Sequence, residues 1–196
     1  MKLSEVRRTV SHRLTGHPAR LLARTSIAPD TLTWIGLGIS LGAAAALATG
    51  RFPLGGGLLL LGGMFDMLDG ALARTTNRTT RLGALLDSTL DRLSESAIFF
   101  GLLLFYTAQG SVCGILLVNA ALVASVMVSY IKARGEGLDL ECKVGFLTRE
   151  LRVLVLVLGL FLNQALIALA VIAVFGSATV AQRFLHLRQM DRKQRD

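Results

Sequence analysis

Six long apolar segments, separated by short polar connections, most constrain how this 196-residue chain can fold. Most are near the roughly 20 residues of helix that cross a bilayer. Because the three prolines lie outside these runs and no ten-residue alternating segments occur, unbroken helices are favoured over a barrel. We therefore predict an all-α integral membrane protein with six transmembrane helices, at about 31–48, 54–72, 82–106, 112–131, 151–162 and 165–184. The fifth segment is short, and its helix is expected to begin earlier, near Phe146.

Basic residues are distributed unevenly among the connections. They gather in the N-terminal segment, the second-to-third and fourth-to-fifth connections and the tail, whereas the other three connections hold only Arg51. By the positive-inside rule this alternation predicts that both termini lie in the cytoplasm. The net charge of +8 is then explained by topology and by attraction to anionic lipids, and nucleic-acid binding is a poor explanation for it.

The N-terminal segment has the pattern of a helix that lies on the membrane surface. Apolar residues recur at helical spacing between basic ones, at Leu3, Val6, Val10 and Leu14. No apolar h-region follows, so no cleavable signal peptide is expected. The predicted organisation is an amphipathic segment at 1–28, the six-helix domain at 29–186 and a basic cytoplasmic tail at 187–196. Cys113 and Cys142 form no recognisable motif and are expected to be unpaired.

Four aspartates stand at the ends of the second and third apolar segments. Asp66 and Asp69 are spaced i, i+3, and Asp87 and Asp91 are spaced i, i+4, so each pair shares one helix face. The polar stretch TTNRTTRL joins the two segments as a cytoplasmic turn, so the two acidic faces can meet. An unpaired carboxylate in hydrocarbon is costly, so these residues need a partner.

A divalent cation is one such partner. Carboxylate oxygens select Mg²⁺, Mn²⁺ or Ca²⁺, and no His or Cys lies in this stretch to suggest zinc. Small residues at Gly70, Ala73 and Gly83 leave room between helices, and Arg74 is placed to meet an anion. A phosphate or pyrophosphate held through metal ions fits this set. The aspartates also fit two other interpretations, which are an ion or proton pathway in a transporter and structural ion pairs with Arg74, Arg78, Arg81 or Arg92.

The aspartates belong to a longer pattern that resembles the signature of the CDP-alcohol phosphatidyltransferases. All eight of its fixed positions are present, as Asp66-x-x-Asp69-Gly70-x-x-Ala73-Arg74, eight residues, then Gly83-x-x-x-Asp87-x-x-x-Asp91. The six segments, the basic start and a Pro-x-Thr-x-Thr stretch are also similar to the family, although this chain has Pro29-Asp30 where members often have Pro-Asn.

The resemblance implies an enzyme that transfers a phosphatidyl group from CDP-diacylglycerol to an alcohol and releases CMP. It implies that Asp66, Asp69, Asp87 and Asp91 hold two Mg²⁺ (or Mn²⁺) ions, with Asp91 also the general base. The CDP-lipid would be bound by Gly70, Ala73, Arg74, Gly83 and Thr33. It further implies the plasma membrane of a prokaryote, with the active site facing the cytoplasm, and a homodimer.

The acceptor alcohol is indicated by two stretches. LDSTLDR, at 86–92, and the connection SYIKARGEGLDLECKVGFLTRELR both resemble the prokaryotic phosphatidylinositol-phosphate synthases. A phosphorylated polyol would use basic residues in that connection, namely Lys132, Arg134, Lys143, Arg149 and Arg152. We therefore expect myo-inositol 1-phosphate as acceptor. Glycerol 3-phosphate, in a phosphatidylglycerophosphate synthase, suits the same charge, and positive-inside topology alone would also place basic residues here.

Overall fold

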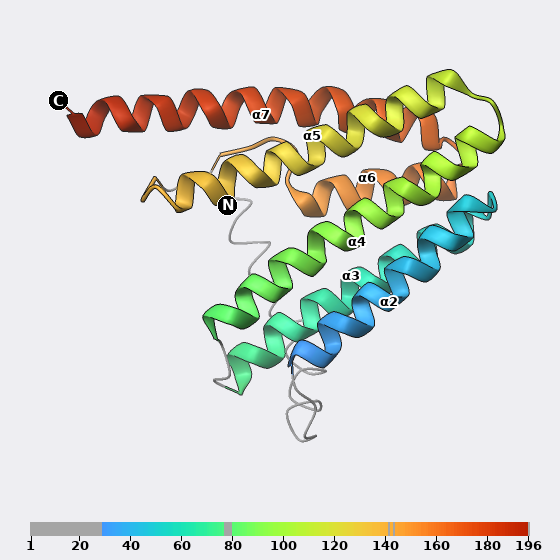
Figure 1. The fold of residues 1–196 in the computed structure, drawn as a ribbon, viewed down its shortest axis with the longest axis horizontal. Coiled ribbons are helices and arrows are strands. Elements are labelled where there is room, and N and C mark those ends of the chain that lie inside the picture. Colours follow the sequence, from blue (N-terminus) through green and yellow to red (C-terminus); the bar gives the residue numbers. More distant parts are fainter. Residues whose placement is uncertain (1–28, 77–79, 141, 143, 196) are drawn as a thin grey trace, which may run out of the picture. The chain divides into compact units, whose positions relative to one another are not determined.

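The structure, a computed structural model, is all-helical over the residues that it describes, which are 29–76, 80–140, 142 and 144–195. These residues form six helices and no strand (Figure 1), namely α2 (Pro29–Ala48), α3 (Phe52–Thr75), α4 (Arg81–Ala108), α5 (Val112–Glu136), α6 (Arg149–Phe161) and α7 (Ala165–Arg195). The predicted amphipathic segment at 1–28 and the predicted acceptor residue Lys143 lie outside the described residues.

The predicted helices match the observed ones in number and order. The fifth was expected to begin before Leu151, near Phe146, and α6 does begin earlier than Leu151, but at Arg149, after extended Thr148. The sixth was expected to end near 184, but α7 continues to Arg195. No proline or glycine follows Gly176 in the sequence, so nothing interrupts the helix at the end of the apolar run.

The described chain divides into two compact units. The first contains residues 29–42 and 58–97, apart from 77–79, and the second contains 43–57 and 98–195, apart from 141 and 143. In the first unit, the early part of α2 packs on the later part of α3 through small residues. A Cβ added to Gly36 would lie 3.8 Å from the Gly62 carbonyl oxygen, and one added to Gly62 would lie 3.2 Å from Ser40 Oγ.

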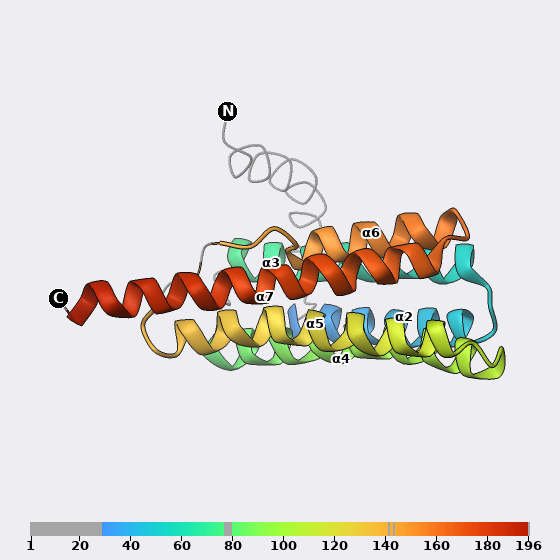
Figure 2. The ribbon, with the colours of Figure 1, turned by 90° about the horizontal axis from the view of Figure 1, so that it is seen from above.

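The second unit is built around α5, α6 and α7. Figures 1 and 2 show α5 and α7 side by side, and α6 also packs on α7. Gly176 of α7 allows this approach, because an added Cβ would lie 3.0 Å from Ala124 Cβ on α5. The buried core of this unit is aliphatic and includes Val118, Ala121, Val128, Leu160, Leu169 and Ile172.

Four of the described helices are long and apolar enough to cross a membrane. These stretches are Asp30–Ala48, Phe52–Ala73, Val112–Glu136 and Ala165–Arg192. Large apolar side chains are exposed along them, among them Trp34, Leu116 and Ile167. An apolar outer surface of this extent is expected where hydrocarbon, rather than water, surrounds the helices.

Candidate metal and phosphate site

Three aspartates from two helices come together in the first unit. Asp66 and Asp69 lie on α3 and Asp87 lies on α4, and one carboxylate oxygen from each falls within 4.8 Å of the other two. Asp69 is buried, and the other two are half-buried. The pair on α3 therefore meets the first aspartate of the pair on α4. Three carboxylates so close repel one another unless a cation lies between them.

The chemistry of this donor set fits a hard divalent cation. Mg²⁺ and Mn²⁺ prefer carboxylate oxygens, and these three residues offer only such atoms. The helix that holds two of them, α3, packs closely on α2. A Cβ added to Gly36 would lie 3.8 Å from Asp66 Oδ1, so the backbone of α2 passes close beside this carboxylate.

Thr33 of α2 contacts the cluster directly. Its Oγ1 donates a hydrogen bond of 2.7 Å to Asp69 Oδ2, and both residues are buried. A hydrogen bond to one oxygen of a ligating carboxylate fixes its orientation and leaves the other oxygen for the metal. Sequence reasoning placed Thr33 at the CDP-lipid and missed this contact. The only signal was a threonine near the start of an apolar helix, which is too general to indicate a partner.

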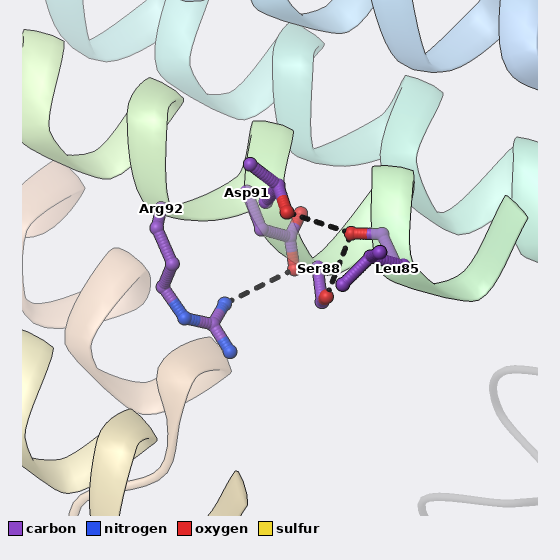
Figure 3. Close-up of polar contacts among 5 residues, drawn as sticks. Leu85, Ser88, Asp91 and Arg92 are labelled. Atoms are coloured by element: carbon purple, nitrogen blue, oxygen red, sulfur yellow. Dashed lines mark hydrogen bonds and ion pairs between the residues drawn. The ribbon is translucent and has the colours of Figure 1, made fainter. Parts of the chain in front are cut away.

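Asp91 lies one turn beyond Asp87 on α4 and is buried. The group of three gathered carboxylates in the described chain does not include it. Its Oδ2 is 3.5 Å from Nη1 of Arg92, the next residue, and Figure 3 shows the two side chains pointing toward each other. The predicted metal-binding and base roles of Asp91 remain predictions.

Hydroxyl groups near Asp91 bond to their own helix. Ser88 Oγ donates to the Leu85 carbonyl at 2.9 Å (Figure 3). Thr89 Oγ1 donates to the same carbonyl at 2.8 Å. Side chains that bond back to the preceding turn satisfy their polar groups locally. The carboxylates are therefore the groups on this part of α4 that suit binding of a cation.

The small residues of the motif lie beside the cluster. Gly70 and Ala73 are half-buried on α3, and Arg74 follows on the same helix, although its side chain lies outside the described part. Gly83 has a local role, because its N–H donates to Thr80 Oγ1 at 2.9 Å at the start of α4. A Cβ added to Gly83 would lie 2.9 Å from the same oxygen. The threonine thus caps α4, and a side chain at position 83 would crowd its hydroxyl.

The predicted acceptor residues belong to the second unit. Arg149 and Arg152 are in the first turn of α6, and Arg152 is buried with Nη1 3.4 Å from the Leu147 carbonyl oxygen. Arg134 is exposed in the last turn of α5. Lys132 is exposed and lies 3.7 Å from Glu136, one turn further along. Of the described basic residues in this set, Arg152 is thus the buried one.

Comparison with known proteins shows the family to which the chain belongs. The sequence model of the family described as CDP-alcohol phosphatidyltransferase matches residues 26–181. The chain belongs to this family. The CDP-alcohol phosphatidyltransferases are enzymes, so this chain is a membrane-associated transferase by class and not a transporter.

Two curated relatives show which members of this family the chain is similar to. An archaetidylinositol phosphate synthase of Methanothermobacter thermautotrophicus is 36% identical over 175 residues, covering 85% of this chain and 86% of its own. A phosphatidylinositol phosphate synthase of Cutibacterium acnes is 36% identical over 187 residues, covering 87% of this chain and 90% of its own.

Solved structures are similar to this CDP-alcohol phosphatidyltransferase over most of its length. The Mycobacterium tuberculosis phosphatidylinositol phosphate synthase with CDP-DAG bound superposes with a TM-score of 0.80 at 32% identity, covering 89% of this chain and 94% of that one. The same enzyme in complex with manganese and citrate also gives a TM-score of 0.80 at 32% identity, with 88% of each chain covered. The family resemblance expected from the motif is confirmed, and so is the all-helical class of the described residues.

Proposed function

We propose that this chain transfers the phosphatidyl group of CDP-diacylglycerol to myo-inositol 1-phosphate, giving phosphatidylinositol phosphate and CMP. The observation that carries the proposal is the gathering of Asp66, Asp69 and Asp87 within a chain of this family. The acceptor is supported by the names of the two curated relatives, each about 36% identical over most of the chain.

The carboxylates are proposed to bind the nucleotide pyrophosphate through two Mg²⁺ or Mn²⁺ ions. Asp66, Asp69 and Asp87 are already grouped, and Asp91 is one turn away on α4. Bound ions would supply positive charge that neutralises the pyrophosphate and stabilises the departing CMP. Thr33 holds Asp69 in its orientation within this arrangement.

Asp91 is proposed to accept the proton of the attacking hydroxyl. The hydroxyl oxygen then forms a bond to the lipid-side phosphorus, and the bond from that phosphorus to the bridging pyrophosphate oxygen breaks, releasing CMP. Burial of Asp91 keeps it from bulk water, which favours its use as a base at close range. Arg92, in contact with Asp91, is placed to hold the carboxylate on one side of the helix.

The substrate-binding residues are proposed by family correspondence and by chemistry. Gly70, Ala73 and Gly83 leave space for the cytidine, Thr33 lies at its edge, and Arg74 contacts phosphate. For the acceptor phosphate we propose Arg134, Arg149 and Arg152, with smaller contributions from Lys132 and Lys143. Arg152 has the strongest physical support of these, since a charge-assisted bond is strongest where water is excluded.

The membrane arrangement belongs to the same proposal. All six helices would cross the plasma membrane of a prokaryote, the 1–28 segment would lie on the inner leaflet, and both termini and the site would face the cytoplasm. The catalytic domain would extend over 29–186, followed by the tail at 187–196, and two chains would form a homodimer. The basic connections support this orientation.

A direct assay tests the function. Purified protein with Mg²⁺ and CDP-diacylglycerol is incubated in turn with myo-inositol 1-phosphate, glycerol 3-phosphate, inositol and serine, and CMP release is measured. A parallel series uses a CDP-linked ether lipid, because one relative is an archaetidylinositol phosphate synthase. We expect release with inositol phosphate and none after chelation of the metal. Release with glycerol 3-phosphate alone would overturn the acceptor assignment and leave the class intact.

A further inference from the structure

Helix α7 is longer than a single membrane crossing requires. Its 31 residues extend about 46 Å, whereas the hydrocarbon core of a bilayer is about 30 Å thick. Figures 1 and 2 show α7 lying beside α5 and continuing past the end of that helix. A crossing by α7 therefore leaves about three of its turns outside the hydrocarbon.

The exposed side of α7 changes from apolar to basic within about one turn. Phe184 and Leu185 are 60% and 53% exposed, and Phe175 is exposed further back along the helix. Arg188 and Arg192 follow Phe184 at intervals of four residues, so they continue the same exposed stripe. Exposed apolar side chains suit lipid, and arginine side chains extend their charge to the membrane surface. The stripe thus places the edge of the hydrocarbon between Leu185 and Arg188.

The end of α5 lies at the same level and packs on this part of α7. A Cβ added to Gly176 of α7 would lie 3.0 Å from Ala124 Cβ on α5. Eleven residues further along both helices, a Cβ added to Gly135 would lie 3.0 Å from the two Cδ atoms of Leu187. The helices therefore run side by side in the same direction as far as Leu187. Tyrosine is enriched at membrane–water interfaces, and exposed Tyr130 of α5 lies within about a turn of the level at which α7 becomes basic.

The two arginines carry charge that no described residue neutralises. Arg188 and Arg192 are both exposed, and neither forms an ion pair within the described part of the chain. Asp191, the carboxylate nearest to them in sequence, is half-buried on the adjoining face of the helix. Packing of Leu187 on α5 keeps the arginines on the exposed side. Their charge, one turn beyond lipid-facing Phe184, is complementary to the headgroups of anionic lipids.

We propose that Arg188 and Arg192 bind the headgroup phosphates of anionic phospholipids, whose acyl chains pack on Phe184 and Leu185. A guanidinium presents paired donors in a plane, which match two oxygens of one phosphate. Each basic residue near an anionic membrane surface strengthens such binding about fivefold. The lipid site lies in the leaflet at the C-terminal end of α7. It uses neither the carboxylate cluster nor the proposed acceptor residues, so it does not depend on the proposed reaction.

Fluorescence quenching by brominated lipids tests this. The chain has one tryptophan, and in a Trp34→Phe background Phe184→Trp supplies a reporter one turn from Arg188. The protein is reconstituted in vesicles of phosphatidylglycerol and phosphatidylcholine, with bromine on one lipid or on the other. The extent of quenching gives the relative binding constant of the two lipids beside the reporter. We expect phosphatidylglycerol to bind at least about fivefold more tightly, and we expect added salt to weaken this preference.

Two kinds of control separate a lipid site from a general effect of charge. Replacing Arg188 and Arg192 together with Gln should lower the preference at least about fivefold, whereas Arg188→Lys keeps the charge and should stay within about twofold. A Phe175→Trp reporter, on the same stripe but about 14 Å further into the membrane, should detect no preference. If the Phe184→Trp chain does not fold, Leu185→Trp reports on the same site. Equal binding of both lipids, a preference unchanged in the double Gln variant, or the same preference at position 175 overturns the inference.

Discussion

At the scale of single residues, the carboxylates of Asp66, Asp69 and Asp87 account for the binding of a divalent cation. Replacing any one with Asn keeps the shape and removes a ligand charge. We expect CMP release to fall at least about a hundredfold, because the pyrophosphate loses its electrostatic partner. Asp139→Asn, at an exposed position outside the cluster whose φ of 57° asparagine tolerates, serves as the matched control. Near-normal turnover of any cluster variant at ordinary Mg²⁺ would show that the site has been assigned wrongly.

Asp91 differs from these three in its surroundings, because it is buried beside Arg92 rather than gathered with them. A residue that removes a proton contributes to turnover more than to binding. Asp91→Asn is therefore expected to bind CDP-lipid with at most a modest loss and to lower kcat at least about a hundredfold. Equilibrium binding of the CDP-lipid and single-turnover CMP release measure the two effects separately. Equal losses in both would make Asp91 an ordinary ligand.

At the scale of elements, α2 supports the metal site through one hydroxyl group. Thr33→Val removes the bond to Asp69 and keeps the volume, whereas Thr33→Ser keeps the donor. Groups that orient a metal ligand typically contribute about tenfold to a hundredfold in metal affinity. Thr33→Val should therefore need about tenfold more Mg²⁺ for half-maximal activity, and Thr33→Ser should restore it. A titration of CMP release against Mg²⁺ measures this, and identical curves for both variants would exclude a role for the hydroxyl.

Close packing between helices gives an element-scale prediction about stability. In the second unit a Cβ added to Gly101 of α4 would overlap the carbonyl oxygen of Ala44 on α2. Gly101→Ala should destabilise the fold by about 1–3 kcal/mol, because the helices must separate. Gly57→Ala is the matched control, since it also places an alanine within a helix and meets nothing within 4 Å. Thermal unfolding in detergent should show a lower Tm for the first variant only.

The sequence predicts elements better than contacts between them. Apolar runs locate the helices well, and the starts of α5 and α7 fall at the predicted residues, Val112 and Ala165. The meeting of Asp66 and Asp69 with Asp87 could be predicted, because these residues flank one short connection. The bonds of Thr33 to Asp69 and of Arg183 to Val144 could not, because they join residues 36 and 39 positions apart. Such contacts depend on how each helix is rotated about its axis. Because a helix in a membrane is apolar on its lipid-facing sides as well as in the core, its sequence carries little sign of that rotation.

At the scale of the whole molecule, the number of membrane crossings fixes which connections face the cytoplasm. Four described helices meet the length and hydropathy of a span, and α4 and α6 are the two that do not. With 28 residues, α4 is about 42 Å long, whereas the 13 residues of α6 extend about 20 Å. The hydrocarbon core is about 30 Å thick, so α6 crosses only with help from its flanking residues. If all six helices cross, Gln109 lies outside the cell and Leu138 lies in the cytoplasm. If only the four span-like helices cross, Gln109 lies in the cytoplasm and Leu138 lies outside.

Single cysteines at these two exposed positions distinguish the arrangements. In a background in which Cys113 and Cys142 are replaced by alanine, Gln109→Cys and Leu138→Cys are treated with a membrane-impermeant maleimide in intact cells. Six crossings predict that Gln109→Cys is labelled at once and that Leu138→Cys is labelled only after permeabilisation. Gln164→Cys, between α6 and α7, faces outside in either arrangement and confirms that the reagent has access. Labelling of Leu138→Cys in intact cells would place the α5–α6 connection, with Arg149 and Arg152 at its end, on the wrong side of the membrane for a cytoplasmic acceptor.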